Sequence, residues 1–299
     1  MHRRHFVYRS SLLSTVCLSA PLLGMEPLAR SGPSVLRLSL AAYSLRKYLM
    51  PSGEKPAQMD LFQFVDYCHD NGLGGAELTS YYFPENVSPD YLQRLKLHCH
   101  VRGVTISGGA IRNDYCQLDP VALAHDLEHT RKWIDHYADL GAPVIRIFAG
   151  QPVEGEESSR TLARCAEVCE LACEYAQRRG VILALENHGG VTAKAEGLLE
   201  VVKQVESPAF GVNFDSGNFL SSGDPYAELA KIAPYAVNAQ IKVEVEIDGQ
   251  KVPTDLPRVV KILRDAGYSG WLALEYEGAQ EPLTAIPAWL NQLKPLVDG

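Results

Sequence analysis

Strand-like and helix-like segments alternate along this 299-residue chain from residue 35 almost to its end. The strand-like runs are continuously apolar, as in APVIRIFAG at 142–150, which is typical of parallel strands buried on both faces. The helix-like runs carry capping signals, such as Ser88-Pro89 at the start and Gly103 at the end of one helix. Eight such units in about 265 residues predict an α/β fold, a single (β/α)₈ TIM barrel over residues 34–299.

The predicted strands are apolar runs that end in polar residues, and they cover 35–44, 74–80, 104–110, 142–150, 181–186, 209–215, 235–240 and 271–275. The predicted helices lie at 59–72, 88–103, 119–141, 158–180, 194–206, 224–234, 255–267 and 281–296. An open doubly wound sheet is the alternative, but it normally has a glycine-rich phosphate loop after the first strand. That position reads AAYSLRKYL, without glycine, so the barrel is favoured.

Composition narrows the class of partner. The net charge of −8 argues against nucleic acid, because binding to a phosphate backbone needs a basic surface. The sequence contains no run of about 18 or more apolar residues, so no membrane span is expected. A nucleic-acid partner and a membrane span are therefore not expected, while the oligomeric state stays open.

The first residues read MHRRHFVYRSSLLSTVCLSAPLLG, with Arg3-Arg4 and Phe6 ahead of an apolar stretch. This order resembles a twin-arginine export signal. We therefore expect residues 1–33 to be an export leader outside the barrel, and the protein to be exported to the periplasm. The alternative is a disordered basic start without an export role.

Two stripes of metal-ligating residue types fall on predicted helices: Cys165, Cys169 and Cys173, and His125, His129 and His136. The cysteines are expected to be small buried hydrophobic residues. The histidines share a face that belongs to the outer ring, so we expect them to be solvated or to pack between helices.

Four polar residues end the last four predicted strands: Glu186, Asp215, Gln240 and Glu275. Function in a parallel barrel lies at the C-terminal ends of the strands, so these side chains should gather at one mouth. A single such acid is often a helix cap or a solvated carboxylate, but three clustered carboxylates repel one another unless a cation neutralises them. An all-oxygen set favours Mn²⁺ or Mg²⁺ over Zn²⁺.

Four motifs resemble the xylose-isomerase-like barrel superfamily of sugar isomerases, epimerases and related lyases: ALENHGG (184–190), NFDSGN (213–218), QIKVE (240–244) and ALEYEG (273–278). The resemblance implies that Glu186, Asp215, Gln240 and Glu275 bind the metal. Most members have histidine where this chain has Gln240. Members similar to 3-dehydroshikimate dehydratases have glutamine there, and also a histidine at the position of His188.

The resemblance implies proton abstraction next to a carbonyl, with the metal polarising that carbonyl. Epimerisation would use Glu186 and Glu275 as bases on opposite faces of the substrate. Elimination would use His188 as the base. Gln240 cannot act as a base, because an amide does not lose a proton near neutral pH.

Further polar residues at the strand ends are candidates for substrate binding: Tyr43, Glu77, Arg146, Asn218 and Lys242. Each has an ordinary alternative. Arg146 could form a structural ion pair with Glu77 or Glu186. Lys242 could be a solvated loop lysine.

The leading hypothesis is a divalent-metal-dependent isomerase or epimerase of a non-phosphorylated sugar or polyol. The second is a metal-dependent lyase or dehydratase of a keto-sugar, keto-glycoside or cyclic polyol, which Gln240 and His188 favour. A non-catalytic sugar-binding protein is a remote alternative. An apurinic endonuclease is disfavoured by the net charge and by Gln240.

Overall fold

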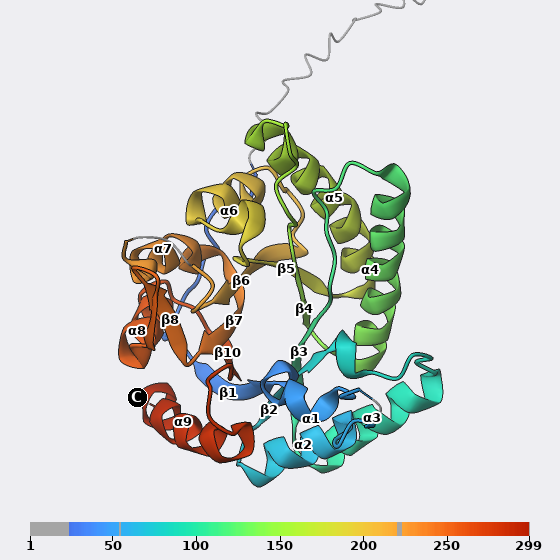
Figure 1. Cartoon of the computed structure of the whole chain (residues 1–299), viewed down its shortest axis with the longest axis vertical. Helices are drawn as coiled ribbons and strands as arrows, with labels where there is room; N and C mark the ends of the chain where they lie inside the picture. Colours follow the sequence, from blue (N-terminus) through green and yellow to red (C-terminus); the bar gives the residue numbers. More distant parts are fainter. Residues whose placement is uncertain (1–23, 54, 220–222, 299) are drawn as a thin grey trace, which may run out of the picture.

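A computed structural model describes residues 24–53, 55–219 and 223–298, and its centre is a closed barrel of parallel strands (Figure 1). The strands follow one another around the barrel in the order β1-β10-β7-β6-β5-β4-β3-β2. They are β1 (Leu36–Ala41), β2 (Gly75–Thr79), β3 (Thr105–Ala110), β4 (Val144–Ile147), β5 (Ile182–Glu186), β6 (Phe210–Asp215), β7 (Ala236–Lys242) and β10 (Gly270–Glu275). The barrel closes where β1 pairs with β10, with Leu38 opposite Leu272. The predicted (β/α)₈ barrel is therefore confirmed.

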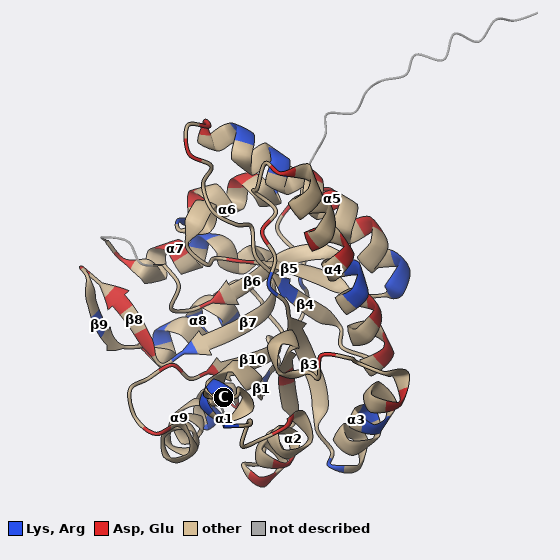
Figure 2. Cartoon of the chain, turned by 45° about the vertical axis from the view of Figure 1, so that its right-hand side comes forward, with Lys and Arg blue, Asp and Glu red and all other residues tan. Residues whose placement is uncertain are grey.

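Long helices form the outer ring, and their bounds lie within a few residues of those predicted. They are α2 (Leu61–Asp70), α3 (Pro89–Val101), α4 (Pro120–Leu140), α5 (Ser158–Arg179), α6 (Ala195–Val202), α7 (Pro225–Ile232), α8 (Leu256–Asp265) and α9 (Pro282–Val297). Caps explain the agreement: the Ser88 hydroxyl accepts a hydrogen bond from the Tyr91 amide at 3.1 Å, and α4 stops at Gly141 with φ 84°. Figure 2 shows acidic and basic segments interspersed along these helices, as expected for an outer ring that faces water.

The core lies between the strands and the helices. All six residues of β6 are buried, as the continuous apolar run predicted. The cysteine stripe on α5 is also buried, and the six cysteines in the described part of the chain form no disulfide. Their prediction as small hydrophobic core residues is confirmed.

Short elements connect these units. Before α2 the chain forms the 3₁₀ turn η1 (Ala42–Leu45) and the single-turn helix α1 (Arg46–Leu49). Further 3₁₀ turns are η2 (Ser80–Tyr82), η3 (Gly190–Thr192) and η4 (Ala233–Tyr235). A hairpin of β8 (Glu244–Ile247) and β9 (Gln250–Pro253) follows β7, and sequence analysis missed it. The sequence did contain a signal for this hairpin, the pair Asp248-Gly249, which is typical of tight hairpin turns. Both residues adopt the positive φ that such a turn requires, 52° and 76°.

The segment before β1 packs against the barrel. The Met25 amide donates to the Val205 carbonyl at 3.0 Å, and the Arg30 guanidinium donates to the Ala266 carbonyl at 3.0 Å. The packed region thus begins ahead of residue 34, where the boundary was predicted. Residues 1–23, which hold Arg3-Arg4 and Phe6, lie outside the described residues. Among the helices that the structure describes, none is long and apolar enough to cross a membrane.

Candidate active site

A cavity of about 340 Å³ opens at the C-terminal ends of the barrel strands. Most of the predicted site residues line it: Tyr43, Arg146, Glu186, His188, Asn218, Lys242 and Glu275. The other three, Glu77, Asp215 and Gln240, are buried beside it with at most 1% exposure. The fold therefore brings residues from seven strand ends or the loops after them into one site, across almost 240 positions of sequence.

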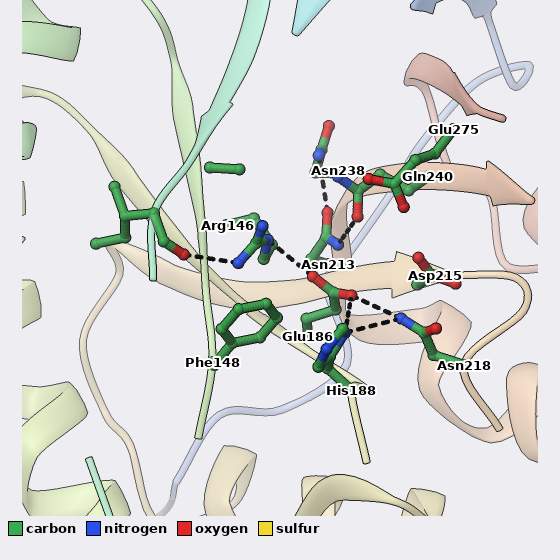
Figure 3. Close-up of polar contacts among 12 residues, drawn as sticks. Arg146, Phe148, Glu186, His188, Asn213, Asp215, Asn218, Asn238, Gln240 and Glu275 are labelled. Atoms are coloured by element: carbon green, nitrogen blue, oxygen red, sulfur yellow. Dashed lines mark hydrogen bonds and ion pairs between the residues drawn. The ribbon is translucent and has the colours of Figure 1, made fainter. Parts of the chain in front are cut away.

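Glu186 ends β5 and is paired with Arg146 of β4. The Arg146 Nε lies 2.8 Å from Glu186 Oε2, and both side chains are almost completely buried (Figure 3). Arg146 also donates to the Ile111 carbonyl at 2.6 Å, and its Cζ lies 3.9 Å from the centre of the Phe148 ring. Burial acts to raise the pKa of Glu186, but Arg146 and the contact with His188 outweigh it, so this pKa is lowered. Glu186 is therefore ionised, and Arg146 is a structural partner rather than a free substrate clamp.

The other oxygen of Glu186 faces the cavity. Asn218 donates to Glu186 Oε1 at 2.7 Å, and His188 Nδ1 lies 3.0 Å from the same oxygen (Figure 3). The His188 ring stacks on Phe148, with the centroids 4.3 Å apart, and about 50% of the His188 side chain is exposed. The histidine is therefore oriented by its neighbours and still open to a ligand.

Lys242, the last residue of β7, lies among three carboxylates. Its Nζ is 2.6 Å from Glu275 Oε2, 3.6 Å from Asp215 Oδ2, and paired with Glu277. These carboxylates outweigh the effect of burial and hold the pKa of Lys242 well above its usual value, so it is an ammonium ion. Burial, with a contribution from Glu186 and Glu275, raises the pKa of Asp215 well above its usual value. Burial thus disfavours the ionised form of Asp215, and an added cation beside it would favour that form.

Gln240 is held in one orientation by a network inside the barrel. Its Nε2 donates to Glu77 Oε1 at 2.6 Å. Its Oε1 accepts from Asn213 at 2.7 Å (Figure 3). Asn238 donates to both Glu77, at 2.9 Å, and Asn213, at 2.8 Å. Burial raises the pKa of Glu77 to about 7, although these two amide donors favour its ionised form. Glu77 therefore supports Gln240, and it lies away from the cavity lining.

A divalent cation fits the chemistry of this donor set. Asp215 Oδ2 is fully buried and accepts no hydrogen bond from any described residue. The carboxylates of Glu186, Asp215, Glu275 and Glu277 outnumber the cations of Arg146 and Lys242 by two. Among the described residues, no group of three or more His, Cys, Asp or Glu side chains is already arranged to hold a metal ion. Because Lys242 contacts three of these acids and Arg146 the fourth, a bound cation would have to displace or share these contacts.

Sequence reasoning missed several members of the site. Asn213 and Asn238 each precede a predicted ligand by two residues on the same strand, and strand alternation places both side chains inside the barrel. That spacing was a usable signal. Glu277 and Phe148 also line the cavity, and Glu277 follows Glu275 at the same spacing of two.

Comparison with known proteins assigns the fold family. The family model of the xylose isomerase-like TIM barrel matches residues 65–294. The chain belongs to this family. An uncharacterised protein of Methanocaldococcus jannaschii is 22% identical in an alignment 230 positions long, which covers 69% of this chain and 74% of that protein.

Solved structures of the family share the fold at low identity. D-psicose 3-epimerase with D-tagatose from Clostridium cellulolyticum H10 has a TM-score of 0.71 at 15% identity, covering 87% of this chain and 99% of that one. L-ribulose 3-epimerase has a TM-score of 0.70 at 16% identity, and the match covers 88% of this chain and 95% of that one. A xylose isomerase domain protein from Planctomyces limnophilus has a TM-score of 0.66 at 17% identity, and the match covers 88% of this chain and 97% of that one. The similar structures thus include several sugar 3-epimerases.

Proposed function

We propose that this protein is a divalent-metal-dependent isomerase or epimerase of a non-phosphorylated sugar or polyol, with Mn²⁺ or Mg²⁺ as its cofactor. The observation that carries the proposal is the group of acids from β5, β6 and β10 at one barrel mouth, with a buried Asp215 oxygen that accepts no hydrogen bond from the described part of the chain. The structural likeness to sugar 3-epimerases supports the substrate class.

Glu186, Asp215, Gln240 and Glu275 would hold the metal. The bound cation would polarise the carbonyl of the substrate and neutralise negative charge that develops on it. Gln240 would contribute its amide oxygen, which keeps one lone pair beyond the hydrogen bond from Asn213. Glu77 would maintain this orientation, because its carboxylate accepts from the amide nitrogen.

Proton transfer is assigned to the two glutamates that border the cavity. β5 and β10 are separated by β6 and β7 around the barrel, so Glu186 and Glu275 approach the cavity from different sides. One carboxylate would remove the proton next to the carbonyl and the other would return a proton to the opposite face. Arg146 and Lys242 would hold these carboxylates in place.

Turnover after metal removal tests this function. Candidate ketoses, incubated with the protein in D₂O, should gain deuterium at the carbon next to the carbonyl and yield an isomer. EDTA should abolish this exchange and Mn²⁺ should restore it. Glu186→Gln and Glu275→Gln should each reduce it by at least about 10²-fold, as expected for loss of a general base. Exchange that is indifferent to EDTA would refute the metal assignment.

A lyase or dehydratase is the second candidate, and His188 favours it. The His188 ring borders the cavity, is half-exposed and contacts Glu186 at 3.0 Å, so it can accept a proton and share it with the carboxylate. Elimination would then remove water or an aglycone from the carbon beta to the carbonyl. Mass spectrometry of the reaction in H₂O separates the two candidates, because elimination lowers the mass of the substrate and isomerisation leaves it unchanged. His188→Asn should abolish elimination and leave the Glu186–Glu275 exchange within about tenfold.

A further inference from the structure

A groove of about 960 Å³ adjoins the catalytic cavity, which has a volume of about 340 Å³. Five residues line both spaces: Tyr43, Tyr81, Arg112, Asn113 and Asp114. One ligand can therefore extend from the cavity into the groove. The cavity has room for a single sugar ring, and the groove has room for a larger group attached to it.

Two tyrosines stand where the groove meets the cavity. The Arg46 Cζ lies 4.8 Å from the centre of the Tyr43 ring, and the Arg112 Cζ lies 5.3 Å from that of Tyr81. Cation–π contacts of this kind hold an aromatic ring in one orientation. The two rings are thus held at the junction by neighbouring guanidinium groups.

The far wall of the groove consists of apolar and aromatic side chains. Helix α4 contributes Ala122, His129 and Trp133, and the turn after α1 contributes Met50, which is 49% exposed. The His129 ring meets Trp133 edge-on, with the centroids 6.3 Å apart. His125 lines the same groove, so two of the histidines expected to be solvated or to pack between helices border the groove as well.

Several polar side chains that line the groove already have hydrogen-bond partners in the protein. Asn113 donates to the Phe148 carbonyl at 2.6 Å and accepts from the Phe148 amide at 2.9 Å. Asp126 accepts from the Asp114 amide at 2.8 Å and from Gln117 at 2.9 Å. A ligand in the groove would therefore contact mainly rings and aliphatic surface, which suits an aromatic group better than a second sugar.

We propose that the groove binds the aromatic aglycone of a glycoside whose sugar ring occupies the catalytic cavity. The inference rests on the proposed function, because it takes the cavity as a sugar site. It names the substrate class more narrowly: the keto form of an aryl glycoside, whose ring carbonyl the proposed proton transfer needs, rather than a free monosaccharide. Unoxidised glycosides then serve as binding probes and not as substrates. Tyr43 and Tyr81 would stack on the aglycone at the junction, and Trp133 and Met50 would cover its outer part.

Binding of matched glycosides tests the inference without requiring turnover. Isothermal titration would compare the methyl and p-nitrophenyl β-glycosides of glucose, galactose and xylose, with cellobiose as a two-sugar probe. At least one aryl glycoside should bind about tenfold more tightly than its methyl partner, and cellobiose should gain no such advantage over methyl glucoside. Equal affinities within every pair, or an equal gain with cellobiose, would overturn the inference.

Two tryptophan variants on α4 locate the effect. Ala122→Trp fills the groove and should remove the aryl advantage while changing the methyl glycoside Kd less than twofold. Ala124→Trp is the matched control, since Ala124 is exposed on the same helix and lies off the groove, and it should behave as wild type. If the two variants show the same ratio of aryl to methyl affinity, the assignment is contradicted. A change of oligomeric state in Ala122→Trp alone also contradicts it, because the groove would then be a subunit contact.

The outcomes separate this inference from the proposed function. Glu186→Gln should lose turnover but keep the ratio of aryl to methyl affinity, because Glu186 lies in the cavity and not in the groove. Methyl glycosides that bind while aryl groups add nothing would refute only the groove. Failure of every glycoside to bind would also refute the groove, while the exchange of free ketoses in D₂O tests the sugar assignment independently.

Discussion

Replacing Arg146 by methionine should destabilise the barrel strongly. Arg146 is buried beside Glu186, with Nε 2.8 Å from Oε2, so methionine would leave the carboxylate buried without its partner. At an effective dielectric constant of about 20, charges about 2.8 Å apart attract by about 6 kcal/mol, which bounds the pair from above. Removal of one partner of a buried pair typically costs about 3–5 kcal/mol, and the lost bond to the Ile111 carbonyl adds to it. We therefore expect a loss of about 3–5 kcal/mol in the free energy of unfolding.

Urea unfolding followed by circular dichroism, in EDTA, would measure this loss. Glu186→Gln and the double variant complete a thermodynamic cycle, in which the coupling energy should be about 1.5–3 kcal/mol. Arg131→Met is the control, because Arg131 is exposed on α4 and its ion pair with Glu128 is long, at 4.0 Å. Its loss should cost less than about 0.5 kcal/mol. If Arg146→Met does not fold, Arg146→Gln, which removes the charge but keeps a hydrogen-bond donor, takes its place in the cycle. A coupling energy below about 0.5 kcal/mol would refute the pairing of Arg146 with Glu186.

Three further predictions concern other parts of the chain. Ser44→Ala should cost about 2–3 kcal/mol in urea unfolding, because the Ser44 hydroxyl donates to the Leu274 carbonyl at 3.0 Å and accepts from the Tyr276 amide at 2.8 Å where the barrel closes; a cost below about 0.5 kcal/mol would contradict these bonds. Hydrogen bonds from Arg164 and Thr161 lower the pKa of Glu156 to about 2, so its contribution to stability is present above pH about 4.5 and is lost as the pH falls towards 2. The stability difference between wild type and Glu156→Gln, measured by thermal melting, should therefore shrink over that range, and a constant difference would exclude the linkage. We also propose that the leader directs export by a twin-arginine route. Changing Arg3-Arg4 to lysines should then retain the protein in the cytoplasm upon fractionation, with unchanged fractionation arguing against that route.

Local rules explain why so much of the architecture was predictable. Capping residues, strand-length apolar runs and terminal glycines act within a few positions, so the helices appear within a few residues of their expected bounds. The rule that strand ends meet at one mouth then placed Glu186, His188 and Glu275 at one cavity from sequence alone. The missed β8–β9 hairpin obeyed a local rule as well, since Asp248-Gly249 is a strong turn signal.

The partners of these residues could not be predicted in the same way. The sequence left two roles open for Arg146, a substrate clamp and a structural ion pair. The pairing of β4 with β5 places Arg146 beside Glu186, and the ion pair results from it. Glu77 and Gln240 are 163 positions apart, yet the barrel joins them by a 2.6 Å hydrogen bond. Such contacts depend on strand register and on which interior space remains, and neither is encoded within a short window of sequence.

The sequence alone thus determined that this chain would form a (β/α)₈ barrel with acids at its C-terminal mouth. The reason is that hydrophobic periodicity, helix capping residues and polar residues at strand ends are local properties of a sequence. The tertiary structure decided what each polar side chain does. Lys242 lies among carboxylates, Glu77 supports Gln240, and α4 turns one face towards a groove beside the cavity. The physical reason is that burial, charge pairing and cavity shape arise only when residues distant in sequence meet in space.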